Sequence, residues 1–133
     1  MHNNRLLKNR EFLDAVDVAI STAQHEIYLI SAFLKTEVLL HLSQKIDANV
    51  NVTIISRWRL GDMTSGASDI EAFNIARSND WSFYIDNDLH AKALLVDSNV
   101  LFLGSANYTA KGMHLFGRGN NELNIEVRPS EDE

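Results

Sequence analysis

The hydrophobic positions of the chain recur with two periods, one typical of helices and one typical of strands. Apolar residues repeat at helical spacing over residues 9–23, and a second helical pattern begins at Thr36. Ser68 and Glu71 have the spacing of a capping box, which predicts a third helix through about Arg77. Short apolar or alternating runs predict strands over residues 25–33, 50–56, 81–85, 89–96, 100–103 and 122–127.

The remaining segments carry turn residues, and their positions predict one domain built on a mixed sheet. Residues 57–67 are predicted as a loop and residues 109–119 as a loop or helical turn, because both contain Gly beside polar residues. Asp97 opens a turn between two strands, which predicts a hairpin. Helices that alternate with strands before a run of consecutive strands predict an α/β fold, with a mixed β-sheet flanked by helices. We expect a single domain over residues 1–128 and an acidic tail over residues 129–133.

Composition limits the classes of function. The 133 residues include no Cys, which excludes disulfide bonds, thiolate zinc sites and a cysteine nucleophile. No apolar run is long enough for a signal peptide or a membrane span, so we expect a soluble, cytoplasmic protein without a membrane partner. The 12 Lys and Arg against 18 Asp and Glu give a net charge of −6. Broad coating of nucleic acid is therefore disfavoured, and any site for phosphate has to be local.

His90 and Lys92 are the first candidates for chemistry. On the predicted strand 89–96 they project to the same side, since side chains alternate between the faces of a sheet. A Lys ammonium neutralises a phosphate oxygen, and a neighbouring imidazole acts as a nucleophile or moves a proton. Asp97 lies an odd number of positions further on, so we expect it to cap the hairpin. An ordinary exposed strand face is the alternative interpretation of His90 and Lys92.

Two later segments bring polar groups towards the same end of the predicted sheet. Ser105 and Asn107 follow the neighbouring strand, where a hydroxyl and an amide are able to donate hydrogen bonds to phosphate oxygens. We expect Gly104 to serve backbone geometry or a close approach. Glu122 begins the polar face of the last strand, and its carboxylate is a candidate for fixing the tautomer of His90. An exposed carboxylate without a catalytic role is the alternative for Glu122.

One spacing in the chain resembles the HKD motif of the phospholipase D superfamily, with every signature position matched: His90-x-Lys92-x4-Asp97-x6-Gly104-Ser105-x-Asn107. The resemblance is to the short members that carry a single motif, among them bacterial nucleases. It implies that the chain is one half-unit of the superfamily's α/β fold.

The resemblance also implies a reaction. Members of the superfamily cleave or transfer phosphodiesters without a metal or another cofactor, through a covalent phosphohistidine. Two motifs make one active site, and this chain has a single motif, which implies a homodimer that forms the site. His90 would be the nucleophile in one subunit and the general acid in the other. Lys92, Ser105 and Asn107 would bind the phosphoryl oxygens, and Glu122 would orient the histidine.

The substrate is open at this level. We expect nucleic acid, either DNA or RNA, and Arg57, Trp58 and Arg59 are candidate contacts with it because they follow a predicted strand. Surface or packing roles are the alternatives for these three residues. A second hypothesis is a nucleic-acid-binding or regulatory module with weak catalysis, which the net charge favours. A phospholipid phosphodiesterase is a further alternative, and an additional domain or a partner protein for targeting is also left open.

Overall fold

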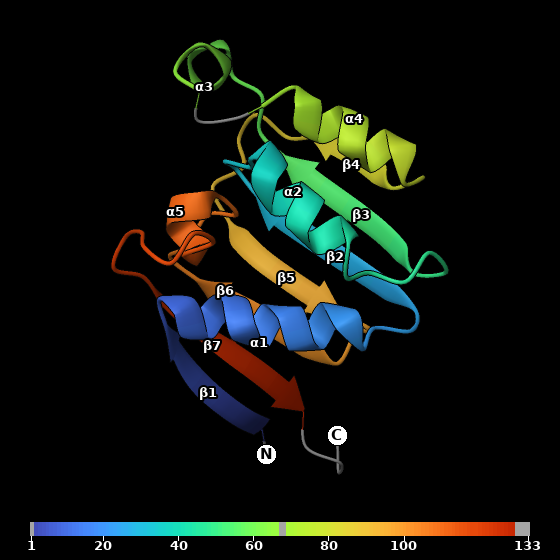
Figure 1. Cartoon of the computed structure of the whole chain (residues 1–133), viewed down its shortest axis with the longest axis vertical. Helices are drawn as coiled ribbons and strands as arrows, with labels where there is room; N and C mark the ends of the chain where they lie inside the picture. The colour runs from blue at the N-terminus through green and yellow to red at the C-terminus, as the bar shows by residue number, and fades with distance from the viewer. Residues whose placement is uncertain (1, 67–68, 130–133) are drawn as a thin grey trace.

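A mixed β-sheet forms the centre of the computed structural model, which describes residues 2–66 and 69–129 (Figure 1). Within those residues the sheet has seven strands in the order β1-β7-β6-β5-β2-β3-β4. The strands are β1 (His2–Lys8), β2 (Glu26–Ser31), β3 (Asn51–Ser56), β4 (Ser82–Ile85), β5 (Lys92–Val96), β6 (Val100–Gly104) and β7 (Leu123–Pro129). The helices are α1 (Arg10–Ser21), α2 (Thr36–Ser43), α3 (Leu60–Thr64), α4 (Glu71–Ser78) and α5 (Ala110–Met113).

The strand directions bring several chain ends to one end of the sheet. β3 runs parallel to both β2 and β4, whereas β5 runs antiparallel to β2. The antiparallel pattern continues through β6, β7 and β1. Consequently β2, β3 and β6 end in the same region where β5 and β7 begin. We call this region the site end of the sheet.

Helices α1, α2 and α4 lie on one face of the sheet (Figure 1), and each turns buried residues towards it. Phe12 of α1 meets Phe102 of β6 edge to face, with ring centroids 6.0 Å apart. Alternate strand residues on this face are buried with the helices: Ile27, Leu29, Val52, Ile54, Leu94, Val96, Val100 and Phe102.

The opposite face of the sheet carries apolar side chains that are partly exposed. The register places Leu6, Ile125 and Leu103 in one row across β1, β7 and β6. The exposed fraction is 65% at Leu6 and 41% at Leu103. The core of the described residues therefore lies between the sheet and the helices on its other face.

The predicted α/β fold with a mixed sheet is confirmed, and two elements were not predicted. β1 lacks the alternation of apolar and polar residues that predicts a strand, because within residues 4–8 Leu7 is buried and the other side chains are exposed. Pairing with β7 makes this polar segment a strand, since Arg5 lies opposite Glu126 and forms an ion pair with it at 3.2 Å. α3 lies inside the segment predicted as the loop 57–67.

Two predictions fall partly outside the described residues. Ser68, the first residue of the predicted capping box, is outside them, and α4 begins at Glu71 without a side-chain cap from Ile70. Of the expected acidic tail, Pro129 is the last residue of β7, and residues 130–133 are not described.

Asp97 fixes the end of β5 that lies opposite the site end. Its carboxylate accepts hydrogen bonds from the backbone N–H groups of Gln24 at 2.9 Å, His25 at 2.8 Å and Glu26 at 2.9 Å. Burial raises the pKa of Asp97, but these three bonds outweigh burial and hold the pKa below its ordinary value. The residue has a φ of 54°, a left-handed conformation that Asp and Asn tolerate. Asp97 thus ties the turn after β5 to the chain that enters β2.

Replacing this carboxylate tests its contribution to stability. Asp97→Asn keeps a side chain that suits the left-handed backbone but removes the charge, and we expect the free energy of unfolding at pH 7 to fall by about 1–3 kcal/mol. The depressed pKa means that the stabilisation is present above the unfolded pKa of about 3.9 and is lost as the pH falls through the folded value.

Urea unfolding of the variant and the wild type from pH 7 to pH 3 measures this effect. Asp80→Asn is the matched control, because Asp80 is also left-handed, with a φ of 58°, and is exposed. A stability difference for Asp97→Asn that stays constant down to pH 3 would contradict this account.

Candidate active site

The candidate catalytic residues come from three neighbouring strands and meet at the site end. His90 precedes β5, Ser105 and Asn107 follow β6, and Glu122 directly precedes β7. The strands β7, β6 and β5 are adjacent in that order in the sheet. The hairpin between β5 and β6 returns the chain to the site end, so residues that are far apart in the sequence become neighbours there.

The strand predicted over residues 89–96 begins only at Lys92, so His90 lies in the segment that enters β5. Among the residues that the structure describes, this segment has no strand to pair with, because β2 ends at Ser31, opposite Lys92, and the pairing with β6 begins at Ala93. The alternation of side chains along a strand therefore does not determine on which side of the sheet His90 lies. Instead, Nζ of Lys92 donates a hydrogen bond to the backbone oxygen of His90 at 3.2 Å, which holds the ammonium beside the exposed histidine.

Ser105 and Glu122 are hydrogen-bonded to each other. The Ser105 hydroxyl donates to a carboxylate oxygen of Glu122 and accepts from the backbone N–H of Leu123 at 3.0 Å. The backbone N–H of Glu122 donates to Oδ1 of Asn9 at 3.0 Å. The carboxylate is thus fixed at the site end, with Ser105 rather than His90 as its partner. The orienting role of Glu122 stays a prediction.

Gly104 permits a close approach between β6 and β7. A Cβ at this position would lie 2.1 Å from Oδ1 of Asn124 and 2.6 Å from its Cα. The buried Asn124 uses the same oxygen to accept a hydrogen bond from the N–H of Ala106 at 3.3 Å. The glycine therefore lets β7 approach β6 closely, and the contact with Asn124 guides the chain that leaves β6 towards Asn107.

Asn107 places a side-chain amide at the edge of a pocket. The loop around it is held by the backbone N–H of Tyr108, which donates to Oγ of Ser31 at 3.1 Å. Among the described residues, Oδ1 of Asn107 is buried and has no hydrogen-bond partner, although buried polar atoms normally have one. Asn107 and Phe33 both line a pocket of about 440 Å³. Asn107 thus lies at the edge of that pocket, with its amide oxygen buried and unpaired.

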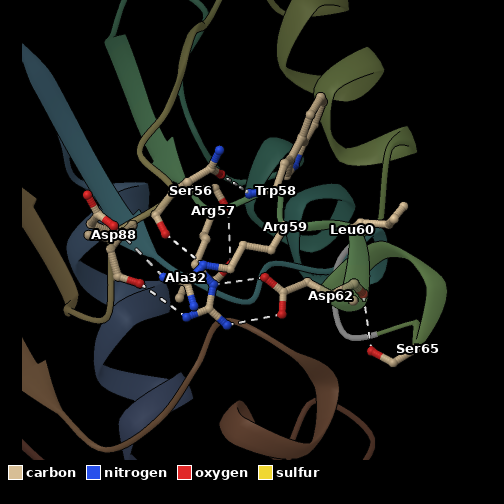
Figure 2. A network of polar contacts seen from close by, with 12 residues as sticks. Ala32, Ser56, Arg57, Trp58, Arg59, Leu60, Asp62, Ser65 and Asp88 are labelled. Atoms are coloured by element: carbon tan, nitrogen blue, oxygen red, sulfur yellow. Dashed lines mark hydrogen bonds and ion pairs between the residues drawn. The ribbon is translucent and has the colours of Figure 1, made fainter.

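Arg57 lies beside Asp62 of α3 (Figure 2) and also contacts the residue that precedes His90. Its Nε and Nη2 atoms bind the two carboxylate oxygens of Asp62 at 2.8 and 3.0 Å. The guanidinium lies over the ring of Phe33, 4.8 Å from its centroid, and Nη1 donates to the backbone oxygen of Leu89 at 3.5 Å. The hydrogen bond from Arg57 lowers the pKa of Asp62 despite burial. The guanidinium of Arg57 is therefore bound by other groups of the protein.

Two further contacts hold the segment before His90 to the chain that follows β3. Nε of Arg59 donates to the backbone oxygen of Asn87 at 2.8 Å, and the backbone N–H of Trp58 donates to Oδ1 of Asn87 at 3.2 Å. The ring of Trp58 packs against Phe73 with centroids 6.0 Å apart. These contacts give the three residues from Arg57 to Arg59 positioning and packing roles. Their predicted contacts with nucleic acid stay predictions.

Sequence reasoning misses Asp62, because the segment 57–67 contains two glycines and is predicted as a loop. The sequence does contain one signal, an acidic side chain five positions after an arginine at a strand end. The short helix α3 brings these two side chains together. In the part of the chain that the structure describes, no three histidine or acidic side chains are arranged to hold a metal ion. The expected independence of metal stays a prediction.

A family model described as the phospholipase D-like domain of cardiolipin synthase matches residues 16–132. This match covers most of the chain, including every candidate residue from His90 to Glu122. The chain belongs to this phospholipase D-like family. The resemblance drawn from the HKD spacing is therefore confirmed. A comparison with curated proteins gives no significant match.

Solved structures share the phospholipase D-like fold. Nuc, a phospholipase D family member from Salmonella typhimurium, matches with a TM-score of 0.75 and 18% identity, over 99% of this chain and 86% of its own. NucT from Helicobacter pylori matches with a TM-score of 0.72 and 16% identity, over 99% and 89%. TrmBL2, an archaeal chromatin protein that binds DNA, matches with a TM-score of 0.61 and 12% identity, over 95% and 45%. At these identities the likeness shows the fold.

None of the helices in residues 2–66 and 69–129 has the length and apolar character needed to cross a membrane.

The contact between Arg57 and Leu89 predicts that this arginine orders the entry to β5 in the phospholipase D-like domain. Backbone amides of this segment are hydrogen-bonded, with Asp86 N–H donating to Ser56 O at 2.9 Å and Leu89 N–H to Asp86 O at 3.2 Å. In Arg57→Met we expect hydrogen exchange at these two amides to accelerate about tenfold or more, because local opening becomes easier.

Hydrogen exchange followed by mass spectrometry or NMR measures this change. Arg77→Met, which removes an exposed arginine from α4, is the matched control and is expected to leave the two rates unchanged. Exchange that accelerates equally throughout the chain in Arg57→Met would show a global loss of stability instead of a local positioning role.

Proposed function

We propose that this chain is a metal-independent phosphodiesterase that cleaves nucleic acid through a covalent phosphohistidine. The observation that supports the proposal best is the meeting of His90, Lys92, Ser105 and Asn107 at one end of the sheet. These residues offer a nucleophile, a cation, a hydroxyl and an amide within one region. Their HKD spacing, in a chain of the phospholipase D-like family, supports the same chemistry.

Each side chain has a role that follows from its chemistry. Lys92 neutralises a non-bridging phosphate oxygen, while Ser105 and Asn107 donate hydrogen bonds to the phosphoryl group as charge develops in the transition state. In this proposal the Glu122 carboxylate changes its partner from the Ser105 hydroxyl to the imidazole of His90, which holds the ring in one orientation and releases the hydroxyl for the phosphate. Together these groups provide the charge stabilisation that a metal ion supplies in other phosphodiesterases.

The reaction needs a second histidine, and a homodimer supplies it. A ring nitrogen of His90 attacks phosphorus, so that an N–P bond forms and the bond to the leaving oxygen breaks. The partner's His90 donates its proton to that oxygen, which departs as an alcohol. Water then gives a proton back to the partner's His90 and attacks phosphorus. The N–P bond breaks, a phosphomonoester leaves, and both histidines return to their starting states.

The two subunits meet at their site ends in this proposal. A two-fold axis through this region places the same residues of both chains around one phosphate. The two histidines are chemically identical until substrate binds. During the reaction the nucleophile has to be neutral and the general acid has to be protonated. The rate is therefore expected to fall on both the acid and the alkaline side of an optimum.

Two alternatives have specific support. A binding module with weak catalysis is supported by the net charge of −6 and by the structural likeness to TrmBL2, a protein that binds DNA. A phospholipid phosphodiesterase is supported by the name of the family model, which refers to cardiolipin synthase. Nucleic acid is favoured because the single HKD motif resembles the short nuclease members of the superfamily. We also propose that residues 1–128, together with Pro129 at the end of β7, form one domain followed by an acidic tail.

Cleavage of labelled single-stranded and double-stranded DNA and of RNA, in excess EDTA, tests the function. We expect the wild type to cleave at least one of these substrates in EDTA, because the reaction uses two histidines and two lysines instead of a metal. His90→Ala is expected to lower the rate by at least about a thousandfold, since it removes both the nucleophile and the general acid.

His25→Ala is the matched control, because this histidine is exposed at the start of β2, away from the site end. It should cleave like the wild type. Cleavage that EDTA abolishes, or that survives in His90→Ala, would overturn the proposed mechanism. DNA binding without cleavage would favour the binding module, and release of a phospholipid headgroup would favour the lipid alternative.

A further inference from the structure

Two neighbouring pockets lie beside α5, and one of them reaches Asn107. The first, of about 670 Å³, is lined by Ala110, Lys111, Phe116, Arg118, Gly119 and Asn120. The second is the pocket of about 440 Å³ that contains Asn107 and Phe33. Ala110, Lys111 and Asn120 line both pockets, so the two lie side by side. We call the combined surface the α5 groove.

The loop that carries the outer part of the α5 groove is held in a defined shape. The backbone N–H of Asn120 donates to the oxygen of Lys111 at 3.0 Å, and Nε2 of His114 lies 2.6 Å from the oxygen of Asn120. A Cβ at Gly119 would lie 2.0 Å from the Lys111 oxygen, so glycine permits this closure. Nη1 of Arg10 donates to the backbone oxygen of His114 at 3.0 Å, which ties the loop to α1.

Helix α5 and this fixed loop together present an aromatic ring and two cations to solvent. Phe116 is 73% exposed, although a ring of this size gains free energy from burial. Lys111 and Arg118 are also exposed, and within the described residues neither forms an ion pair. By contrast, Lys35 at the inner part of the groove is paired with Asp69 at 2.9 Å. The outer part of the groove therefore carries two cations, Lys111 and Arg118, while its inner part is lined by Lys35 with its partner Asp69 nearby and by the carboxylate of Glu37.

An exposed ring in one pocket with two cations matches the chemistry of a single nucleic-acid strand. Every base has a flat face that stacks on an aromatic side chain, and each nucleotide carries one phosphate for a cation. In a duplex the base faces are covered by their neighbours and are not available to a ring. A phospholipid headgroup offers one phosphate but no base to stack.

We infer that the α5 groove binds a single strand of DNA or RNA next to the scissile phosphate, with one base stacked on Phe116 and phosphates at Lys111 and Arg118. This inference rests on the proposed function, because it takes Asn107 as a ligand of the reacting phosphate. It adds a preference for single strands and the direction in which the strand leaves the active site.

Anisotropy of a fluorescein-labelled 12-mer and of its duplex, in EDTA and in the His90→Ala background, measures binding without cleavage. With Phe116→Ala we expect the dissociation constant for the single strand to rise about tenfold and that for the duplex to stay unchanged. With Lys111→Ala or Arg118→Ala we expect weaker binding and a shallower salt dependence, the log–log slope falling by about 0.7 for each phosphate that the protein no longer neutralises.

Two variants at the opposite end of the molecule serve as controls. Lys45→Ala removes an exposed lysine beyond α2, and Val18→Ala trims an exposed apolar residue of α1; both should bind like the parent protein. Equal affinity of Phe116→Ala and its parent for the single strand would overturn the inference, as would an equal loss for strand and duplex.

A small chromogenic diester separates this inference from the proposed function. Bis(4-nitrophenyl) phosphate has no neighbouring nucleotide to place on Phe116, so in the His90-containing protein the ratio of oligonucleotide turnover to small-diester turnover should fall about tenfold with Phe116→Ala. If that ratio is unchanged while the wild type still cleaves in EDTA, the inference fails and the proposed function stands. If neither substrate is cleaved and no strand is bound, both fail.

Discussion

Antiparallel pairing of β5 with β2 is the constraint on which the candidate site depends. It turns the start of β5 towards the region where β2 and β3 end, and so places His90 and Lys92 beside the loop that follows β6. The strand is held near both of its ends. Asp97 accepts three backbone N–H groups at one end, and Arg57 binds the backbone oxygen of Leu89 near the other. Without this pairing the motif residues would share a sequence spacing but no common place in the molecule.

Charge is distributed so that an acidic chain has a local site for phosphate. Arg57 is neutralised by Asp62, which removes it from the set of free cations although it lies close to the motif. Lys92 at the site end and Lys111 and Arg118 along the α5 groove supply the positive charge that the proposed function and the further inference use. A net charge of −6 is compatible with binding of nucleic acid under these conditions, because the attraction acts at short range along one path.

The sequence predicts the sheet class, most strands and the residues of the motif, because these depend on local periodicity and fixed spacing. It does not predict β1, whose polar segment becomes a strand only by pairing with β7, nor the late start of β5, which follows from where β2 and β6 end. The ion pair of Arg57 with Asp62 and the groove around Phe116 escape prediction for a related reason. The ion pair needs the short helix α3 in a segment that its glycines mark as a loop, and the groove needs a loop that Arg10 of the distant helix α1 holds in place.

The central claim is that each chain contributes half of a two-histidine site, and subunit mixing tests it most directly. Wild type and His90→Ala are mixed at known ratios, allowed to exchange subunits, and assayed for cleavage in EDTA. If one site needs His90 from both chains, activity follows the square of the wild-type fraction, so an equal mixture retains about a quarter of the full rate. Activity proportional to the wild-type fraction, with about half the rate in an equal mixture, would show that each chain acts alone and would contradict the account.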